Sequence, residues 1–482
     1  MDTHTAHHAP SIRLALASLS LTMLLPSLGT SIANVGLPAL AMAFDASFQE
    51  VQWVVLAYLL AITALIVSVG RLGDLAGRRR LMLAGIFLFT AASALCGLAP
   101  WLWLLVAARA AQGLGAAIMM ALTMALVGET IPKEKTGSAM GLLGTMSAAG
   151  TALGPSLGGL LIAGPGWQAI FFINLPLGLL AFFLAWRHLP ADCPAAKTQR
   201  ARFDHPGTLL LALTLTAYAL AMTVGHGTFG ACNAVLLLAA IAGAGLFMRV
   251  ETRAASPLIR LALLRNPVLS AGFAMSALVT TVVMATLVVG PFYLSGALAL
   301  DAARVGLVMS AGPVVAALAG VPSGRLVDRL GAGRMSIAGQ AGMAAGSLLL
   351  SMMPARFGIA GYVAPLALIT AGYALFQTAN NTAVMAQVGA DQRGVVSGLL
   401  NLSRNLGLIT GASVMGAVFA FGSATVDIPG AGPDAVAAGM HATFAVSAVL
   451  VALALVIALA SRALARRAKA ADQTLEAGAD VR

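Results

Sequence analysis

Two arginines of this sequence lie inside long apolar segments, where charged side chains are rare. Arg109 is in LVAARAAQGLGAA, with Gln112 one helical turn further on, and Arg404 is in NLSRNLG. A guanidinium in an apolar medium is costly and normally faces a cavity or a polar partner, so both arginines are candidates for the path of a solute or a proton. The alternative for each is a structural role, donating hydrogen bonds to backbone carbonyls of neighbouring helices.

Aromatic and amide side chains recur in the same apolar segments. Such side chains bind planar organic molecules by stacking and by hydrogen bonding. The alternative for each of them is that it joins two helices. The further candidates for a solute or proton path are Asn34, Trp53, Tyr58, Asn174, Tyr293, Tyr373, Gln377, Asn380, Asn381 and Asn405.

Carboxylates are missing from the centres of these segments. All 17 Asp and Glu fall near segment ends, between segments or in the two tails. Four residues at or near segment ends remain as candidate proton carriers: Glu50 and Asp301 on the predicted outer side of the membrane, Glu129 on the predicted inner side, and His226. The alternative for each is that it is an ordinary residue at the end of a membrane span. A cavity that has Arg109 and no carboxylate suits neutral or anionic solutes better than permanent cations.

The sequence lacks the residue groupings that enzymes use. Cys96, Cys193 and Cys232 have neither metal-ligand spacing nor a disulfide pattern, and we find no nucleotide-binding loop and no nucleophile beside a base. We therefore expect no enzymatic activity, no metal site and no cofactor. A sensor is also disfavoured, because only about twenty residues follow Arg462.

The composition indicates an integral membrane protein. Hydrophobic residues make up 59% of the 482 and charged residues only 9%, whereas a soluble protein carries about 25% charged residues. A helix of about 20 apolar residues crosses the bilayer. Fourteen such helices are predicted once residues 136–186 are divided at Gly164-Pro165-Gly166 and residues 205–248 near residues 225–230. The predicted fold class is all-α, with fourteen transmembrane helices.

The basic residues predict the orientation. Nearly all of the 28 Lys and Arg fall on one side if the N-terminus is cytoplasmic, as the positive-inside rule requires. We therefore expect a multi-pass protein of a cell membrane, the bacterial inner membrane, with both termini in the cytoplasm. The net charge of +11 is explained by this topology, and no nucleic-acid partner is expected.

The chain is predicted to contain two related halves. GRLGDLAGRRR from Gly70 is echoed by GRLVDRLGAGR from Gly324, each between the second and third helix of a six-helix block. The predicted units are an N-terminal half at 11–190, a linker with two inserted helices at 191–265, a C-terminal half at 266–464 and a cytoplasmic tail at 465–482. Such repeats place the solute site at their interface, and one half rocks against the other.

Two motifs could control this movement. A carboxylate at the cytoplasmic face could pair with bases or cap a neighbouring helix in one conformation only, and the alternative is a solvated charge cluster. The candidate gating residues are Gly70, Asp74, Gly77, Arg78, Arg79 and Asp328. Glycines spaced by four allow close helix packing and a proline bends a helix, which favours a hinge or a leak seal. The candidate hinge residues are Gly150, Gly154, Pro155, Gly158 and Gly159.

These motifs, with WQAIFFINLPLG from Trp167 and NVGLP from Asn34, resemble the major facilitator superfamily. The fourteen helices and the glycine-proline pattern resemble its drug:proton antiporter branch, of the multidrug efflux type. The resemblance implies alternating access and export of a lipophilic, often aromatic or cationic compound, driven by protons. The expected partners are a small-molecule substrate, the lipid bilayer and protons, and a periplasmic adaptor is left open.

One position departs from the family. The family usually has an acid in the first helix shortly before the Asn-Val pair, and Gly29 occupies the aligned position here. The leading hypothesis is proton-coupled efflux of a drug or metabolite. The alternative is an importer or facilitator of a neutral or anionic aromatic nutrient.

Overall fold

The computed structural model describes residues 12–130, 136–190, 192, 205–224, 230–253, 266–388, 393–424 and 431–479. All regular secondary structure in these ranges is helical. Fourteen helical stretches are long and apolar enough to cross a membrane. The predicted fold class and number of helices are therefore confirmed, including the two predicted breaks, which fall between α5 and α6 and between α8 and α9.

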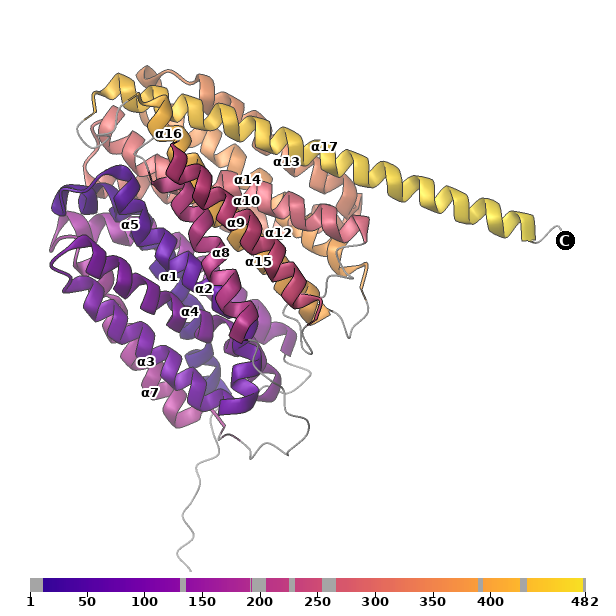
Figure 1. Ribbon diagram of the computed structural model, residues 1–482, viewed down its shortest axis with the longest axis horizontal. Helices are drawn as coiled ribbons and strands as arrows, with labels where there is room; N and C mark the ends of the chain where they lie inside the picture. The colour runs from indigo at the N-terminus through magenta and orange to yellow at the C-terminus, as the bar shows by residue number, and fades with distance from the viewer. Residues whose placement is uncertain are drawn as a thin grey trace, which may run out of the picture.

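The N-terminal helices form one bundle, drawn in indigo to purple in Figure 1. The sixth span consists of two consecutive helices, α6 and α7. Pro155 lies within α5, which continues through it as one helix. The elements are α1 (Ile12–Ala43), α2 (Phe48–Ala76), α3 (Arg78–Gly97), α4 (Leu102–Thr130), α5 (Thr136–Ala163), α6 (Ala169–Phe172) and α7 (Asn174–His188).

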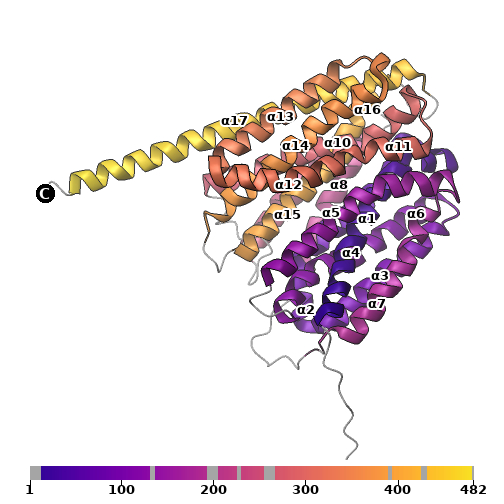
Figure 2. The ribbon, with the colours of Figure 1, turned by 180° about the vertical axis from the view of Figure 1, so that it is seen from behind.

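The C-terminal helices form the second bundle, in salmon-pink through orange to yellow (Figure 2). Two of its spans change to a π-helix, at η3 and η5, and its last helix continues well beyond the length needed to cross a bilayer. The elements are α10 (Pro267–Phe292), η3 (Tyr293–Ala297), α11 (Ala302–Met309), α12 (Ala311–Leu330), α13 (Ala332–Met352), η4 (Ala355–Phe357), α14 (Gly358–Met385), α15 (Arg393–Thr410), η5 (Gly411–Met415), α16 (Gly416–Gly422) and α17 (Pro433–Ala479).

The two inserted helices, α8 (His205–Thr223) and α9 (Ala231–Glu251), pack against each other. Side chains of α8 form hydrogen bonds to both bundles. The indole N–H of Trp53 in α2 donates to Thr223 Oγ1 at 3.2 Å, and the Tyr218 hydroxyl donates to Thr410 Oγ1 in α15 at 3.1 Å. Figure 1 shows the pair lying across the front of both bundles. The predicted boundaries at 190 and 265 adjoin or fall in segments outside the described residues and stay predictions.

The same backbone turn occurs in both bundles between their second and third spans. Gly77, between α2 and α3, has φ 93° and ψ 126°, and Gly331, between α12 and α13, has φ 86° and ψ 141°. Residues with a Cβ rarely adopt such positive φ values, so glycine is required at both turns. This equivalence supports the two related halves inferred from the repeated sequence.

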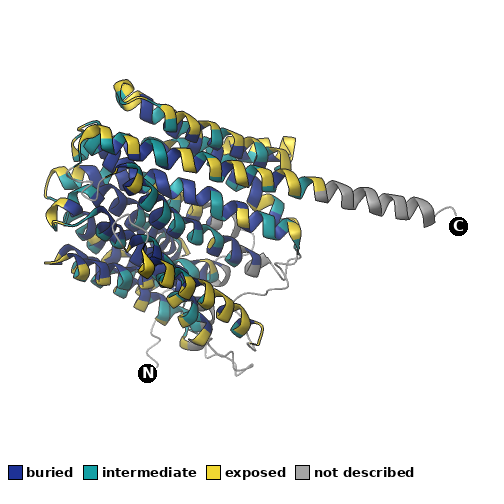
Figure 3. Cartoon of the chain, turned by 45° about the horizontal axis from the view of Figure 1, so that its top comes forward, coloured by how far each residue is buried: buried dark blue, intermediate teal, exposed yellow. Residues whose placement is uncertain are grey.

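Apolar side chains cover the outside of the molecule. Leu179, Val235 and Leu318 are 63%, 64% and 72% exposed, and Figure 3 shows exposed residues along the outer faces of the helices. Exposed leucine and valine on this scale belong against lipid, because a soluble surface would not tolerate such continuous apolar area. The protein is therefore a multi-pass membrane protein.

The two bundles are joined at one end by three phenylalanine rings. Phe48 of α2 packs against Phe292 of α10 with ring centroids 4.7 Å apart and against Phe419 of α16 at 5.2 Å. We call this end, which carries the loops at residues 44–47 and 298–301, the closed end. We call the opposite end, which carries Gly77 and Gly331, the open end.

Helices α5 and α12 are uncovered toward the open end. A Cβ added at Gly144 of α5, or at Gly320 or Gly324 of α12, would meet no atom within 4 Å. Figure 2 shows α5 and α12 diverging from the end where α11 lies. The described helices therefore adopt a conformation in which the bundles touch at the closed end and separate toward the open end.

The phenylalanine cluster yields a prediction for this conformation. Phe48→Ala is expected to shift the protein toward opening of the closed end by at least about tenfold, because each aromatic pair contributes about 0.5–1.5 kcal/mol beyond its burial. Spin labels on cysteines placed at Met42 and Phe421, which are 72% and 78% exposed at the closed end, should report longer distances. Phe357→Ala, which removes an exposed ring at the same end, is the control and should leave the distances unchanged.

Candidate functional site

Arg109 of α4 is fully buried within the N-terminal bundle. Its Nε–H donates to the carbonyl of Val54 in α2 at 2.9 Å, and Nη1 donates to Gln112 Oε1. The guanidinium lies over the ring of Tyr58, with its carbon 4.2 Å from the centroid, a geometry that favours a cation–π interaction. The polar contacts of Arg109 tie α4 to α2, as expected of a hydrogen-bond hub.

The hub extends to two further helices. Gln112 Nε2 donates to Ser93 Oγ of α3 at 2.6 Å, and the Tyr58 hydroxyl donates to the carbonyl of Pro26 in α1 at 3.0 Å. Arg109, Gln112 and Tyr58, all predicted as path residues, are thus brought together in one network that joins α1, α2, α3 and α4.

Gly29 of α1 lies beside this network. A Cβ there would be 3.4 Å from the ring of Phe89 and 3.8 Å from the Tyr58 hydroxyl. The place where the resemblance expects an acid is therefore bordered by two aromatic rings. No described carboxylate forms an ion pair with Arg109, and the Tyr58 ring faces the guanidinium instead.

Two predicted asparagines are buried in the same bundle. Asn34 Nδ2 donates to the carbonyl of Thr30 at 3.0 Å. Asn34 Oδ1, both amide atoms of Asn174 and Nη2 of Arg109 have no hydrogen-bond partner among the described residues. Buried polar atoms without partners are costly, so these positions are suited to hold water.

Trp53 and Tyr293 lie near the closed end, and neither has a hydrogen bond to the hub among the described residues. Trp53 faces the inserted helix α8 through its bond to Thr223. Tyr293 is buried in η3 and stacks on Tyr362, with ring centroids 5.9 Å apart and an interplanar angle of 26°. Both residues join helices in this conformation.

The C-terminal bundle holds the other intramembrane arginine. With the Gln377 amide oriented so that its oxygen faces the guanidinium, Oε1 accepts from Nη1 and Nη2 of Arg404, each at 3.2 Å. This bond links α14 to α15, and both side chains are only partly buried. Asn380 is buried and donates to the carbonyl of Gly272 at 3.1 Å, whereas Asn381 is exposed.

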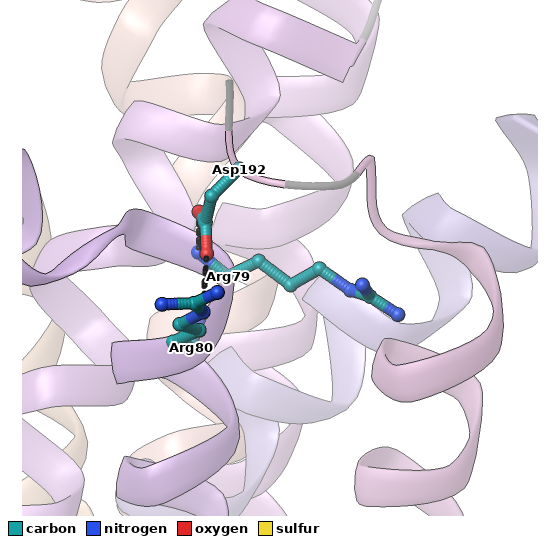
Figure 4. A network of polar contacts seen from close by, with 3 residues as sticks. All are labelled: Arg79, Arg80 and Asp192. Atoms are coloured by element: carbon teal, nitrogen blue, oxygen red, sulfur yellow. Dashed lines mark hydrogen bonds and ion pairs between the residues drawn. The ribbon is translucent and has the colours of Figure 1, made fainter. Parts of the chain in front are cut away.

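The predicted gating motif meets an acid that sequence reasoning did not select. Asp192, which follows α7, accepts hydrogen bonds from the backbone N–H of Arg79 at 2.8 Å and of Arg80 at 3.2 Å (Figure 4). Its carboxylate therefore lies at the N-terminus of α3, where the helix dipole stabilises an anion. A Cβ at Gly77 would lie 2.5 Å from Asp192 Oδ2, so this glycine also makes room for the cap.

Of the predicted gating residues whose side chains are described, Asp328 is not part of this cap. Asp328 is exposed in the last turn of α12. Gly70 lies within α2, and the structure does not describe its surroundings or those of the Asp74 side chain. Arg78 starts α3, and the side chain of Arg79 donates to the carbonyl of Trp186 in α7. The signal for Asp192 was its place in the polar segment directly after the sixth span.

The predicted hinge glycines lie at close helix contacts. Cβ atoms at Gly150, Gly154 and Gly158 would lie 2.5, 2.5 and 2.9 Å from atoms of α1. A Cβ at Gly159, on another side of α5, would lie 2.5 Å from the carbonyl oxygen of Ala302 in α11. α5 is thus held against its own bundle by three glycines and against the opposite bundle by the fourth.

Most of the chain matches one known protein family. A model of the Major Facilitator Superfamily matches residues 19–412 and, in a second match, residues 293–479. This chain belongs to that superfamily. Its members in this comparison include the multidrug resistance protein Stp of Mycobacterium tuberculosis, 34% identical over 411 residues, which cover 84% of this chain and 76% of Stp.

A second relative from the superfamily carries a different description. The riboflavin transporter RibZ of Clostridioides difficile is 30% identical over 84% of this chain and 88% of its own length. Among solved structures, a bacterial homologue of the human lysosomal transporter Spinster, in an inward-facing and unoccupied conformation, matches with a TM-score of 0.69. It covers 94% of this chain and 97% of its own at 15% identity, so this likeness concerns the fold. The chain is a transporter of small molecules and not an enzyme.

The two carboxylates predicted as outer proton carriers have capping contacts in this structure. Glu50 Oε2 accepts from the backbone N–H of Ser47 at 2.9 Å and from its hydroxyl at 2.7 Å, which forms a capping box at the start of α2. Asp301 caps α11 through the N–H of Arg304 at 2.9 Å and pairs with its guanidinium at 3.3 Å. Both carboxylates thus act in helix capping. Glu129 and His226 lie outside the described side chains.

Proposed function

We propose that this secondary transporter exports an uncharged or anionic lipophilic aromatic molecule by alternating access, in exchange for protons. Direction and coupling come from the antiporter resemblance, and the name of the relative Stp supports drug efflux. We place the protein in the inner membrane of a bacterial cell with both termini in the cytoplasm, because the basic residues favour that orientation. The open end then faces the cytoplasm, as a pump awaiting internal solute requires.

The charge class rests on one observation. Arg109 and Arg404 lie within spans, whereas the carboxylates whose side chains the structure describes lie at helix ends or in loops: Asp45, Glu50, Asp192, Glu251, Asp301, Asp328 and Asp434. A permanent cation that left water for this interior would lose its hydration and meet only like charge. Neutral molecules avoid this cost, and anions gain an attractive partner.

A second candidate follows from Gly29 and from the relative RibZ. The absence of the acid usual in the first helix removes the residue most directly connected to proton exchange. The relative RibZ is described as a riboflavin transporter, and riboflavin is an uncharged aromatic compound. The alternative function is therefore facilitated import of a neutral or anionic aromatic nutrient without proton exchange.

Proteoliposomes that contain a pH-sensitive dye test the proposal. Ethidium, riboflavin and 8-anilinonaphthalene-1-sulfonate would be added outside as a permanent cation, a neutral molecule and a permanent anion, with protein-free liposomes as the control. We expect internal alkalinisation with riboflavin or the sulfonate and none with ethidium. Alkalinisation with ethidium alone would contradict the charge class, and riboflavin flux without any pH change would favour the facilitator.

A further inference from the structure

α15 is a transmembrane helix with one polar face. Val396, Leu399 and Ile409 are buried against other helices, while Asn401 is exposed and Arg404 and Asn405 are partly exposed. Residues 401, 404 and 405 are spaced by three and four and therefore share one side of the helix. A guanidinium and two amides would be too costly against hydrocarbon, so we expect this face of α15 to adjoin water between the bundles and not lipid.

α14 contributes a matching face. Gln377 is partly exposed and Asn381, one turn further on, is exposed. Tyr373 lies one turn before Gln377 and is also partly exposed, which places an aromatic ring on the same side of the helix. The contact between Gln377 and Arg404 shows that the polar faces of α14 and α15 adjoin each other.

The guanidinium of Arg404 is oriented so that its two Nη donors could bind an anion. Gln377 Oε1 bridges Nη1 and Nη2, the two donors that a carboxylate or sulfonate would engage with its two oxygens. The amide oxygen is neutral and makes weaker hydrogen bonds than an anionic oxygen. An incoming anion can therefore displace it with a net gain, and the Gln377 amide can turn to donate to the same anion.

Arg109 is not available in this way. Its guanidinium is fully buried, its Nε and Nη1 already donate to Val54 and Gln112, and the Tyr58 ring covers one face. A solute could reach it only if helices of the N-terminal bundle moved apart. The two arginines look alike in sequence, but only Arg404 is accessible in this conformation.

We infer that Arg404 and Gln377 form the anchoring site for the transported solute, and that the anchored group is a carboxylate or sulfonate on a planar aromatic body. The ring of Tyr373 supplies a stacking surface one turn along α14. This inference rests on the proposed function for the idea that the solute is aromatic. It goes beyond the proposed function because it names Arg404 as the residue that recognises the negative charge of the solute.

Equilibrium binding to the purified full chain in detergent tests the site independently of transport direction and protons. Three probes share one ring system: naphthalene-2-sulfonate, 2-naphthalenemethanol and (2-naphthylmethyl)trimethylammonium. The wild type is expected to bind the sulfonate most tightly by calorimetry. Arg404→Gln should weaken sulfonate binding about 10- to 100-fold, the range for a lost charged hydrogen bond, and leave the neutral alcohol within about threefold.

Two further variants separate anchoring from a structural role. Arg404→Lys keeps the charge without the two-pronged donor geometry and should retain part of the preference for the sulfonate. Gln377→Leu removes the neutral competitor of the anion and also one donor to it, so the two effects oppose each other and the variant should still bind the sulfonate more tightly than the alcohol, whereas a purely structural pair would lose binding of all probes. Arg304→Gln, at an exposed arginine of the closed end, is the control and should change nothing.

The inference is overturned if the wild type does not bind the sulfonate, or if Arg404→Gln and Arg404→Lys both bind the three probes as the wild type does. It is also overturned if Arg404→Gln weakens all three probes equally. These results would leave export and proton exchange open to the liposome assay. Conversely, a failure to move protons in liposomes would not affect the measured preference for the sulfonate.

Discussion

Arg109→Leu is expected to reduce transport at least about tenfold and to lower the stability of the folded protein at the same time. The leucine cannot donate to the Val54 carbonyl or to Gln112, which are the partners of Arg109 in this structure. A buried polar group left without its partner costs about 1–3 kcal/mol. The replacement also leaves space beside Tyr58, which adds a cavity cost. Both the missing hydrogen bonds and the cavity weaken the packing of α4 against α2.

Thermal unfolding in detergent and solute flux in liposomes would measure the two effects on the same preparation. Arg304→Leu is the matched control, because that arginine is 69% exposed and its pair with Asp301 lies at the surface. Exposed ion pairs contribute about 0–1 kcal/mol, so neither readout should change much. Lost transport with unchanged unfolding would contradict the structural hub and favour a role of Arg109 in carrying the solute or a proton.

The elements of the fold were predictable because their signals are local. Glycine and proline at residues 164–166 predicted a break between two spans, and the structure ends α5 at Ala163. The repeated glycine-rich motif predicted equivalent turns, which occur at Gly77 and Gly331 with nearly the same backbone angles. Apolar length decides whether a helix can span the bilayer, and this property can be counted along the chain.

The relations between distant side chains were not predictable in this way. Arg109 and Arg404 have similar apolar neighbours in sequence, yet one is fully buried and the other is partly exposed. Their difference arises from which residues of other helices surround them. The same reason applies to Asp192, whose carboxylate caps a helix that begins more than a hundred positions earlier in the chain, and to Trp53, whose partner Thr223 belongs to an inserted helix.

These relations give the α5–α11 contact its importance. Besides the phenylalanine cluster, the contacts between the bundles include a close approach of two helices where Gly159 faces Ala302 and Gly306. Both surfaces there are backbone, so no side chain can turn aside to make room. A movement that opens the closed end must separate these helices, and the absence of side chains at Gly159 and Gly306 lets them close again without a gap.

Gly159→Val is therefore expected to hold the closed end apart and to reduce transport at least about tenfold. Its Cβ would lie 2.5 Å from the Ala302 carbonyl oxygen and 2.9 Å from Gly306 Cα, distances that force the helices to separate. Overpacking of this kind costs about 1–3 kcal/mol, and each 1.4 kcal/mol changes a population tenfold. The cost applies to the closed conformation alone, because the contact is absent when the end opens.

Distances between spin labels at Met42 and Phe421 would report the shift, and solute flux would report its consequence. Gly144→Val, on the same helix, is the matched control because a Cβ there meets no atom within 4 Å. It carries the same cost in helix propensity and should leave the closed end unchanged. If both variants lengthened the distance equally, the effect would come from α5 itself, and the proposed role of the Gly159 contact in closing this end would be wrong. If only Gly159→Val does so, the glycine is needed because the two bundles must touch through their backbones at that point.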